Sequence, residues 1–134
     1  MKELTSFLAA ATVVFFSTAA FGNILHVTNN FDSGSGSLRQ NITDALPGDE
    51  IVFDIVSQTI HLTSGPLLID TSLSINGSVL NITIDAGDTS GVFFIINPGG
   101  GEISVNVANL RAHPESRLSY LLASRLSMRR DMQT

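Results

Sequence analysis

The chain has 134 residues, enough for one domain with a modest hydrophobic core. It contains no cysteine, which excludes a disulfide framework and a thiolate metal site. The formal net charge is −5, and between Asn23 and Leu110 nine acidic residues stand against Arg39 alone. Because nucleic-acid binding requires clustered Lys and Arg, this composition excludes nucleic acid as a partner of that part of the chain.

Residues 1–22 are typical of a secretory signal peptide. A lysine precedes an apolar run, residues 7–16, that is too short to span a bilayer. Small residues then have the spacing of a cleavage site, either Ala20-Phe21-Gly22 or Thr18-Ala19-Ala20. The alternative interpretation is an apolar first helix of the domain. We expect an exported protein, secreted, periplasmic or at the cell surface, whose mature chain begins near Asn23 and has no later membrane span.

Residues 23–49 are predicted to contain a first strand and a short capping helix. The run Ser37-Leu38-Arg39-Gln40 has the form of a capping box, with Ser37 at the N-cap and Gln40 three residues later. Pro47-Gly48 ends the predicted helix. The Gly/Ser run before it lacks the phosphate-loop pattern, so we interpret it as a flexible lead-in rather than an anion site. The apolar residues of the helix fall on one face: Leu38, Ile42, Ala45 and Leu46.

Residues 50–110 contain short strands that recur about every 22 residues. The strand segments are separated by Gly, Asn, Asp, Ser and Thr, which favour turns. The segments that align are Glu50–Asp54 with Ser72–Asn76 and Gln58–Gly65 with Leu80–Gly87 at an offset of 22, Gly101–Val107 a further 21 residues on, and Leu67–Ile69 with Phe93–Ile95 at an offset of 26.

Apolar and polar residues alternate within each segment, which indicates a strand with one buried face. Strands this short that recur at a fixed interval favour a right-handed parallel β-helix of two to three turns, because one turn cannot bury its own apolar face. The alternative is an antiparallel β-sandwich. The stacked residues are predicted to be Ile60, Ile82 and Ile103 inside the coil and His61, Thr83 and Ser104 outside it.

A helix just before the first full turn has a clear purpose in such a coil. The first turn leaves its strand edges and its core open, and an exposed edge recruits other strands. The predicted helix 37–46 precedes the strand that begins at Glu50, so we expect it to cover this open end as a cap.

The first thirty residues of this region resemble the start of large bacterial exported proteins with right-handed parallel β-helix repeats. The resemblance is carried by "HVTNNFDSGSGSLRQNITDALPGDEIVFDI" and "TIHLTSGPLLIDTSLSINGS", which follow the pattern V-T-N-x-x-D-S-G-x-G-S-L-R-Q-A-I-x-x-A-x-x-G-D-x-I-x-F with Asn41 in place of the more usual Ala. Such proteins are similar in fold to pectate-lyase-like solenoids and include adhesin-like and autotransporter-type chains. The resemblance implies an entry cap and no catalytic signature.

Residues 111–134 depart from the repeat pattern. They show no strand alternation and carry five arginines against Glu115 and Asp131. The resembling proteins continue for many more turns, so we expect a truncated or frameshifted reading frame here. The alternative is a basic C-terminal cap or interaction helix.

Metal binding and catalysis find little support in the residues. Asp85 and Asp88, with Asp70 or Asp54 nearby, are the candidate calcium ligands, but acidic residues are also selected at tight corners. No catalytic residue is assigned, since a polysaccharide lyase needs a base beside a calcium cluster and a hydrolase needs paired carboxylates. His26 and His61 are predicted to be unpartnered surface residues.

The expected function is therefore non-catalytic. We predict the N-terminal part of a secreted or surface-displayed β-helix protein, structural or adhesive, whose partners are glycans or other cell-surface molecules and which needs no cofactor. One alternative is a fragment of a polysaccharide lyase or hydrolase. The other is a nonfunctional remnant that would aggregate through its uncapped edge.

Overall fold

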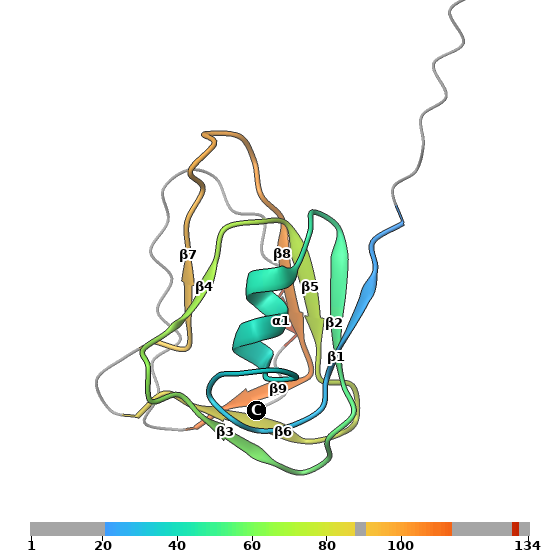
Figure 1. Ribbon diagram of the computed structural model, residues 1–134, viewed down its shortest axis with the longest axis vertical. Coiled ribbons are helices and arrows are strands. Elements are labelled where there is room, and N and C mark those ends of the chain that lie inside the picture. Colours follow the sequence, from blue (N-terminus) through green and yellow to red (C-terminus); the bar gives the residue numbers. More distant parts are fainter. Residues whose placement is uncertain (1–20, 88–90, 114–129, 132–134) are drawn as a thin grey trace, which may run out of the picture.

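The computed structural model is a parallel β-helix of about three turns with one short helix (Figure 1), and it describes residues 21–87, 91–113 and 130–131. The predicted fold class is confirmed, and the antiparallel sandwich is excluded because every strand pair is parallel. The elements in chain order are β1 (Ile24–Val27), α1 (Leu38–Asp44), β2 (Asp49–Phe53), β3 (Thr59–His61), β4 (Leu67–Ile69), β5 (Leu73–Asn76), β6 (Ile82–Asp85), β7 (Phe93–Ile95), β8 (Val105–Ala108), β9 (Leu110–Ala112) and β10 (Arg130–Asp131).

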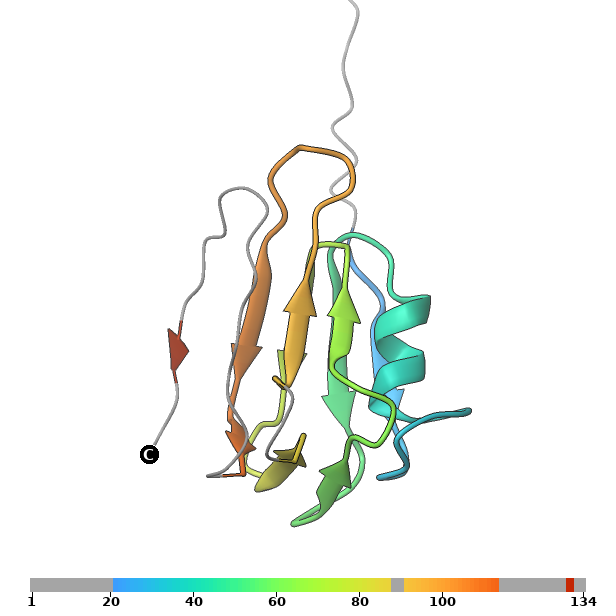
Figure 2. The same cartoon turned by 90° about the vertical axis from the view of Figure 1, so that its left-hand side faces the viewer.

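The strands form three sheets that run along the coil. The longest has the order β1-β2-β5-β8-β10, the second has the order β3-β6-β9, and the third consists of β4 and β7. Figure 2 shows the turns stacked beside one another, with β1 and α1 at one end. Strand β9 begins at Leu110, so the coil runs two residues past the predicted end of the repeats.

The register of the turns differs from the predicted offset of 22 residues. Ile51 of β2 lies opposite Ile75 of β5, and Ile60 of β3 lies opposite Ile84 of β6, both at an offset of 24 residues. A slip of two residues keeps every side chain on the same face, so alternation alone cannot detect it. The predicted offset of 26 between β4 and β7 is correct, since Leu67 lies opposite Phe93.

The third turn also pairs differently from the prediction. The segment that contains Val105 stacks on β5, with Val105 opposite Leu73, and not on β6. The partner of β6 is β9, where Leu110 lies opposite Ile82. The stretch between β7 and β8 is longer than the connection between β4 and β5, and it delays the third turn by several residues. Repeat spacing therefore predicts that turns stack, while loop lengths decide which residues meet.

The core fills the inside of the coil with aliphatic side chains from every turn. Alternation along each strand points the apolar residues inward, and full burial of one such side chain contributes about 1.5–3 kcal/mol. Because neighbouring turns supply the two sides of each contact, no turn can form this core alone. The largest fully buried apolar side chains are Leu38, Ile51, Ile60, Leu67, Ile69, Ile75, Ile82 and Ile84.

Helix α1 is shorter than predicted, and one residue of its predicted apolar face is exposed. Leu38, Ile42 and Ala45 are buried, but the Leu46 side chain is 61% exposed. The helix ends at Asp44, and Ala45 already has extended backbone angles of φ −64° and ψ 137°. Leu46 therefore lies beyond the helix, where the helical periodicity no longer applies.

Candidate functional site

The end of the coil that carries β1 is closed by three different covers, one for each sheet. Strand β1 pairs with β2 at the edge of the five-stranded sheet. The loop between β1 and α1 passes the edge of β3, where the Asn30 side-chain amide donates to the Thr59 carbonyl at 3.2 Å. Helix α1 packs against β4 (Figures 1 and 2). We call β1, the loop 28–36 and α1 together the N-terminal cap.

Arg39 connects the cap to the corner between β3 and β4. Its guanidinium pairs with Asp32, with 2.6 Å between Nη2 and Oδ1. The same group donates to the carbonyl oxygens of Gly65 at 2.7 Å and Pro66 at 2.9 Å. The Arg39 side chain is 21% exposed. A residue of α1 thus satisfies two carbonyl groups of the first full turn that no strand pairs.

Asp32 binds the same corner from the loop. Its Oδ2 accepts hydrogen bonds from the Thr63 hydroxyl at 3.0 Å and from the Ser64 amide at 2.9 Å. Its side chain is 10% exposed, and burial by itself would raise the pKa of the carboxyl. The hydrogen bonds from Ser64, Arg39 and Thr63, with the charge of Arg39, outweigh burial and lower the pKa of Asp32 to about 2.

The N-cap of α1 forms only one half of a capping box. The Ser37 hydroxyl, which is fully buried, accepts from the Gln40 amide at 3.2 Å and donates to the Gly34 carbonyl at 2.7 Å. The Gln40 side chain does not return to the Ser37 amide, because it donates to Asp44 Oδ1 at 2.9 Å. The Ser37 amide instead donates to Gly34 at 3.1 Å, so the local turn replaces the reciprocal bond.

The outward side chains of β3, β6 and β9 form a polar surface. The register places His61 beside Asp85, and His113 follows on the next turn, where its amide binds the Ile84 carbonyl at 3.0 Å. A second row on the same face is polar as well, and the six residues define what we call the outer face: Thr59, Thr83, Arg111, His61, Asp85 and His113.

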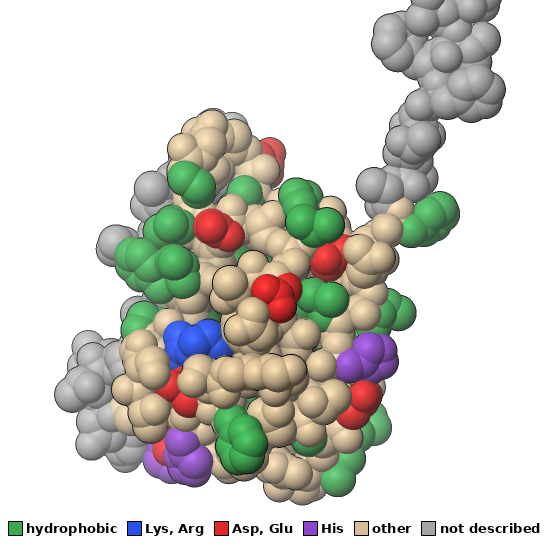
Figure 3. All heavy atoms as spheres, viewed as in Figure 1, with side chains coloured by type: hydrophobic (Ala, Val, Ile, Leu, Met, Phe, Trp, Pro, Cys, Tyr) green, Lys and Arg blue, Asp and Glu red, His purple; other side chains and the backbone are tan. Residues whose placement is uncertain are grey.

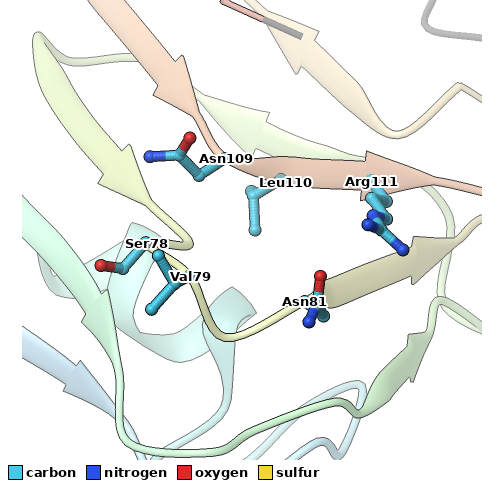
Figure 4. A pocket seen from close by; sticks show the side chains of 6 residues that line it. All are labelled: Ser78, Val79, Asn81, Asn109, Leu110 and Arg111. Carbon is cyan, nitrogen blue, oxygen red and sulfur yellow. The ribbon is translucent and has the colours of Figure 1, made fainter. Parts of the chain in front are cut away.

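A pocket of about 290 Å³ adjoins the outer face at the corner between β5 and β6 and the corner between β8 and β9 (Figure 4). Ser78, Asn81 and Asn109 line it with the backbone in the left-handed region, which permits these tight corners. Arg111 belongs to both the pocket and the outer face. The lining residues are Ser78, Val79, Asn81, Asn109, Leu110 and Arg111.

The two histidines that were predicted to be unpartnered each contact an aspartate on the next turn, which corrects the prediction. His26 Nδ1 lies 3.0 Å from Asp54 Oδ1, and His61 Nδ1 lies 3.1 Å from Asp85 Oδ2. The assumed offset of 22 placed Thr83 opposite His61, whereas the true offset of 24 places Asp85 there. The correct register was the signal that sequence reasoning lacked.

Of the two candidate calcium ligands, Asp88 lies outside the described residues and Asp85 is engaged by protein groups. Asp85 Oδ1 accepts from the Gly87 amide at 2.9 Å. That bond, and after it the nearby His113 and His61, lower the pKa of Asp85 against the effect of its partial burial. Among the residues that the structure describes, no group of three or more His, Asp or Glu is arranged to hold a metal ion.

Asp54 and Asn76, which were predicted to stack, are not opposite each other, because Val52 lies opposite Asn76. Acidic side chains predominate over Lys and Arg on the face of the molecule shown in Figure 3. Of the predicted cleavage region, Ala20 lies outside the described residues and Gly22 packs closely against Gly48. No helix within residues 21–87, 91–113 and 130–131 is long and apolar enough to cross a membrane.

Comparisons with known proteins add no family. No family model matches the chain, and no curated protein or solved structure matches it significantly.

Proposed function

We propose that this protein is the capped N-terminal end of an exported β-helix that contacts glycans through its outer face and performs no catalysis. The observation that supports the proposal best is the N-terminal cap, which closes all three sheets with dedicated contacts. A cap of this kind gives a solenoid a soluble, non-sticky start. Export is suggested by the signal-like residues 1–22 and by the resemblance to exported β-helix proteins.

The outer face and the adjoining pocket have the chemistry for glycan contact. Hydroxyl, amide and guanidinium groups offer hydrogen bonds to sugar hydroxyls, and the Leu110 and Val79 side chains give an apolar wall. Arg111 is exposed, and a guanidinium pairs well with the carboxylate of an acidic sugar. Uronate-containing glycans are therefore the first ligands to test.

The test is binding of the chain 23–134 to immobilised neutral and uronate-containing polysaccharides. We expect Arg111→Ala and Asn81→Ala to weaken binding of the acidic glycan about tenfold, which corresponds to one charge-assisted hydrogen bond. Asp70→Asn, which alters an exposed acid after β4, serves as the control and leaves binding unchanged. Binding that persists in both pocket variants contradicts this assignment of the outer face.

Catalysis is tested on the same polysaccharides, with and without calcium. The proposal predicts no cleavage by the wild-type chain. Turnover that is lost in Asp85→Asn would replace it with a carbohydrate-active enzyme. A nonfunctional remnant predicts instead that the purified chain aggregates, so a soluble monomer that unfolds cooperatively contradicts that alternative.

A further inference from the structure

The start of β1 is held by a buried carboxylate. Asp49 is only 3% exposed, and its Oδ1 accepts a hydrogen bond of 2.7 Å from the backbone amide of Asn23. The Asn23 side-chain amide donates to the same oxygen at 3.4 Å, and the Leu46 amide donates to Oδ2 at 2.8 Å. Asp49 therefore ties the first residue before β1 to the turn that follows α1.

This carboxylate has no cationic side chain as its partner among the described residues. The amides of Leu46 and Asn23 hold the pKa of Asp49 below its ordinary value, although burial opposes them. A buried anion that is bound only by neutral donors gains strongly when one of those donors becomes a cation. The donor at Oδ1 is the backbone nitrogen next to the predicted cleavage region.

We propose that a leader peptidase hydrolyses the bond between Gly22 and Asn23, and that the new α-ammonium group of Asn23 forms an ion pair with Asp49. Water supplies the hydroxyl of the Gly22 carboxylate and a proton to the Asn23 amine, which takes up a second proton at neutral pH. The inference rests on the proposed export of the chain. The nitrogen that already lies 2.7 Å from Oδ1 becomes the charged end of the mature protein.

The geometry favours this bond over the other predicted cleavage position. Cleavage after Ala20 would place the new amino group on Phe21, whose side chain is 92% exposed, two residues away from Asp49. Gly22 passes so close to Gly48 that a Cβ at this position would overlap the Gly48 carbonyl. Glycine at position 22 thus lets the uncleaved chain reach the same place, and its removal relieves a crowded contact without disturbing β1.

The consequence is a pairing that forms only after processing. The mature amino terminus is fixed to β2 through Asp49, and the Glu50 amide also binds the Asn23 carbonyl at 2.9 Å. Through Leu46 the same carboxylate holds the end of α1. Maturation would therefore tighten the N-terminal cap at the junction of its strand and its helix.

The chain offers an unusually clean readout, because Lys2 is its only lysine. In the chain 23–134 the α-amino group is the only primary amine, so the rate of acylation by an amine-selective reagent at pH 7 reports on that group alone. We expect it to react about tenfold more slowly than the α-amino group of a folded chain that begins at Phe21, the change that one unit in its pKa would cause. Asp49→Asn removes this protection, and Glu50→Gln, which changes the neighbouring acid, retains it.

Equal acylation rates for the chains that begin at Asn23 and at Phe21 would overturn the pairing, whether or not Asp49→Asn folds. Processing is tested separately, by the mass of the product when the 134-residue chain is expressed in a secreting bacterium. An exported product that begins at Asn23 supports the inference. One that begins elsewhere overturns processing at this bond, and a chain retained with residues 1–22 attached overturns the proposed export as well.

Discussion

Asp32 and Arg39 are the residues through which the cap recognises the first full turn. Each side chain binds the other and also binds backbone groups of the segment 63–66. Removal of one partner leaves the other charge largely buried without compensation. The pair therefore acts as a specific lock for the corner rather than as a surface salt bridge.

The first prediction concerns the variant Arg39→Ala. We expect it to lower the free energy of unfolding by about 3 kcal/mol, because it leaves the Asp32 carboxylate and two carbonyl groups without a donor. Urea denaturation of the chain 23–134 measures the change. Arg111→Ala is the matched control, since Arg111 is exposed, and should stay within about 0.5 kcal/mol of wild type. Similar losses in the two variants would show that Arg39 has no special role.

The second prediction is a dependence of stability on pH. The pKa of Asp32 falls from 3.8 to about 2 on folding, so the stabilisation is complete above pH 4 and is lost as pH falls toward 2. The shift corresponds to about 2 kcal/mol. Thermal unfolding at several pH values measures it. Asp32→Asn should be less stable at pH 6 and should lose less stability between pH 4 and pH 2; an unchanged slope contradicts the assignment.

At the scale of the element, the N-cap of α1 gives the third prediction. Ser37→Ala removes the acceptor for the Gln40 amide and a donor to the Gly34 carbonyl, both in a buried position. Loss of an N-cap costs about 1 kcal/mol, and up to about 2 kcal/mol in tightly packed proteins. Urea denaturation should show this loss, while Ser35→Ala, an exposed serine two residues earlier, should leave the midpoint unchanged. Equal midpoints for Ser37→Ala and wild type would contradict it.

The sequence patterns predict the elements better than their neighbours. The Ser37-x-x-Gln40 spacing predicts where α1 begins, because capping is a local interaction. Alternation predicts that Ile60 is buried and His61 is exposed, because side-chain direction is fixed within a strand. The His61–Asp85 contact was missed because pairing depends on the length of the intervening loops, which no local pattern encodes. The Asp32–Arg39 lock was missed for the same reason, since the loop between these residues folds back on the corner.

The whole molecule is a stack with an end that must be covered. At the cap end, Leu38 of α1 is fully buried and contributes to the core that β4 and its neighbours build. If α1 lifted away, the edge of β4 and part of the core would face solvent, and such an edge recruits strands from other molecules. The cap should therefore control association between molecules as well as stability.

The fourth prediction tests this role by placing a charge on either side of the cap segment. Leu38→Asp puts a carboxylate in the core and displaces α1, so we expect association that increases with protein concentration in size-exclusion chromatography with light scattering. Leu46→Asp is the matched control, because this leucine is 61% exposed and its replacement leaves α1 in place. Circular dichroism should show that strand structure persists in both variants, which separates loss of the cap from global unfolding. If Leu38→Asp retains its strands and stays monomeric at every concentration, the edges are protected by something other than α1, and the cap is needed only for stability.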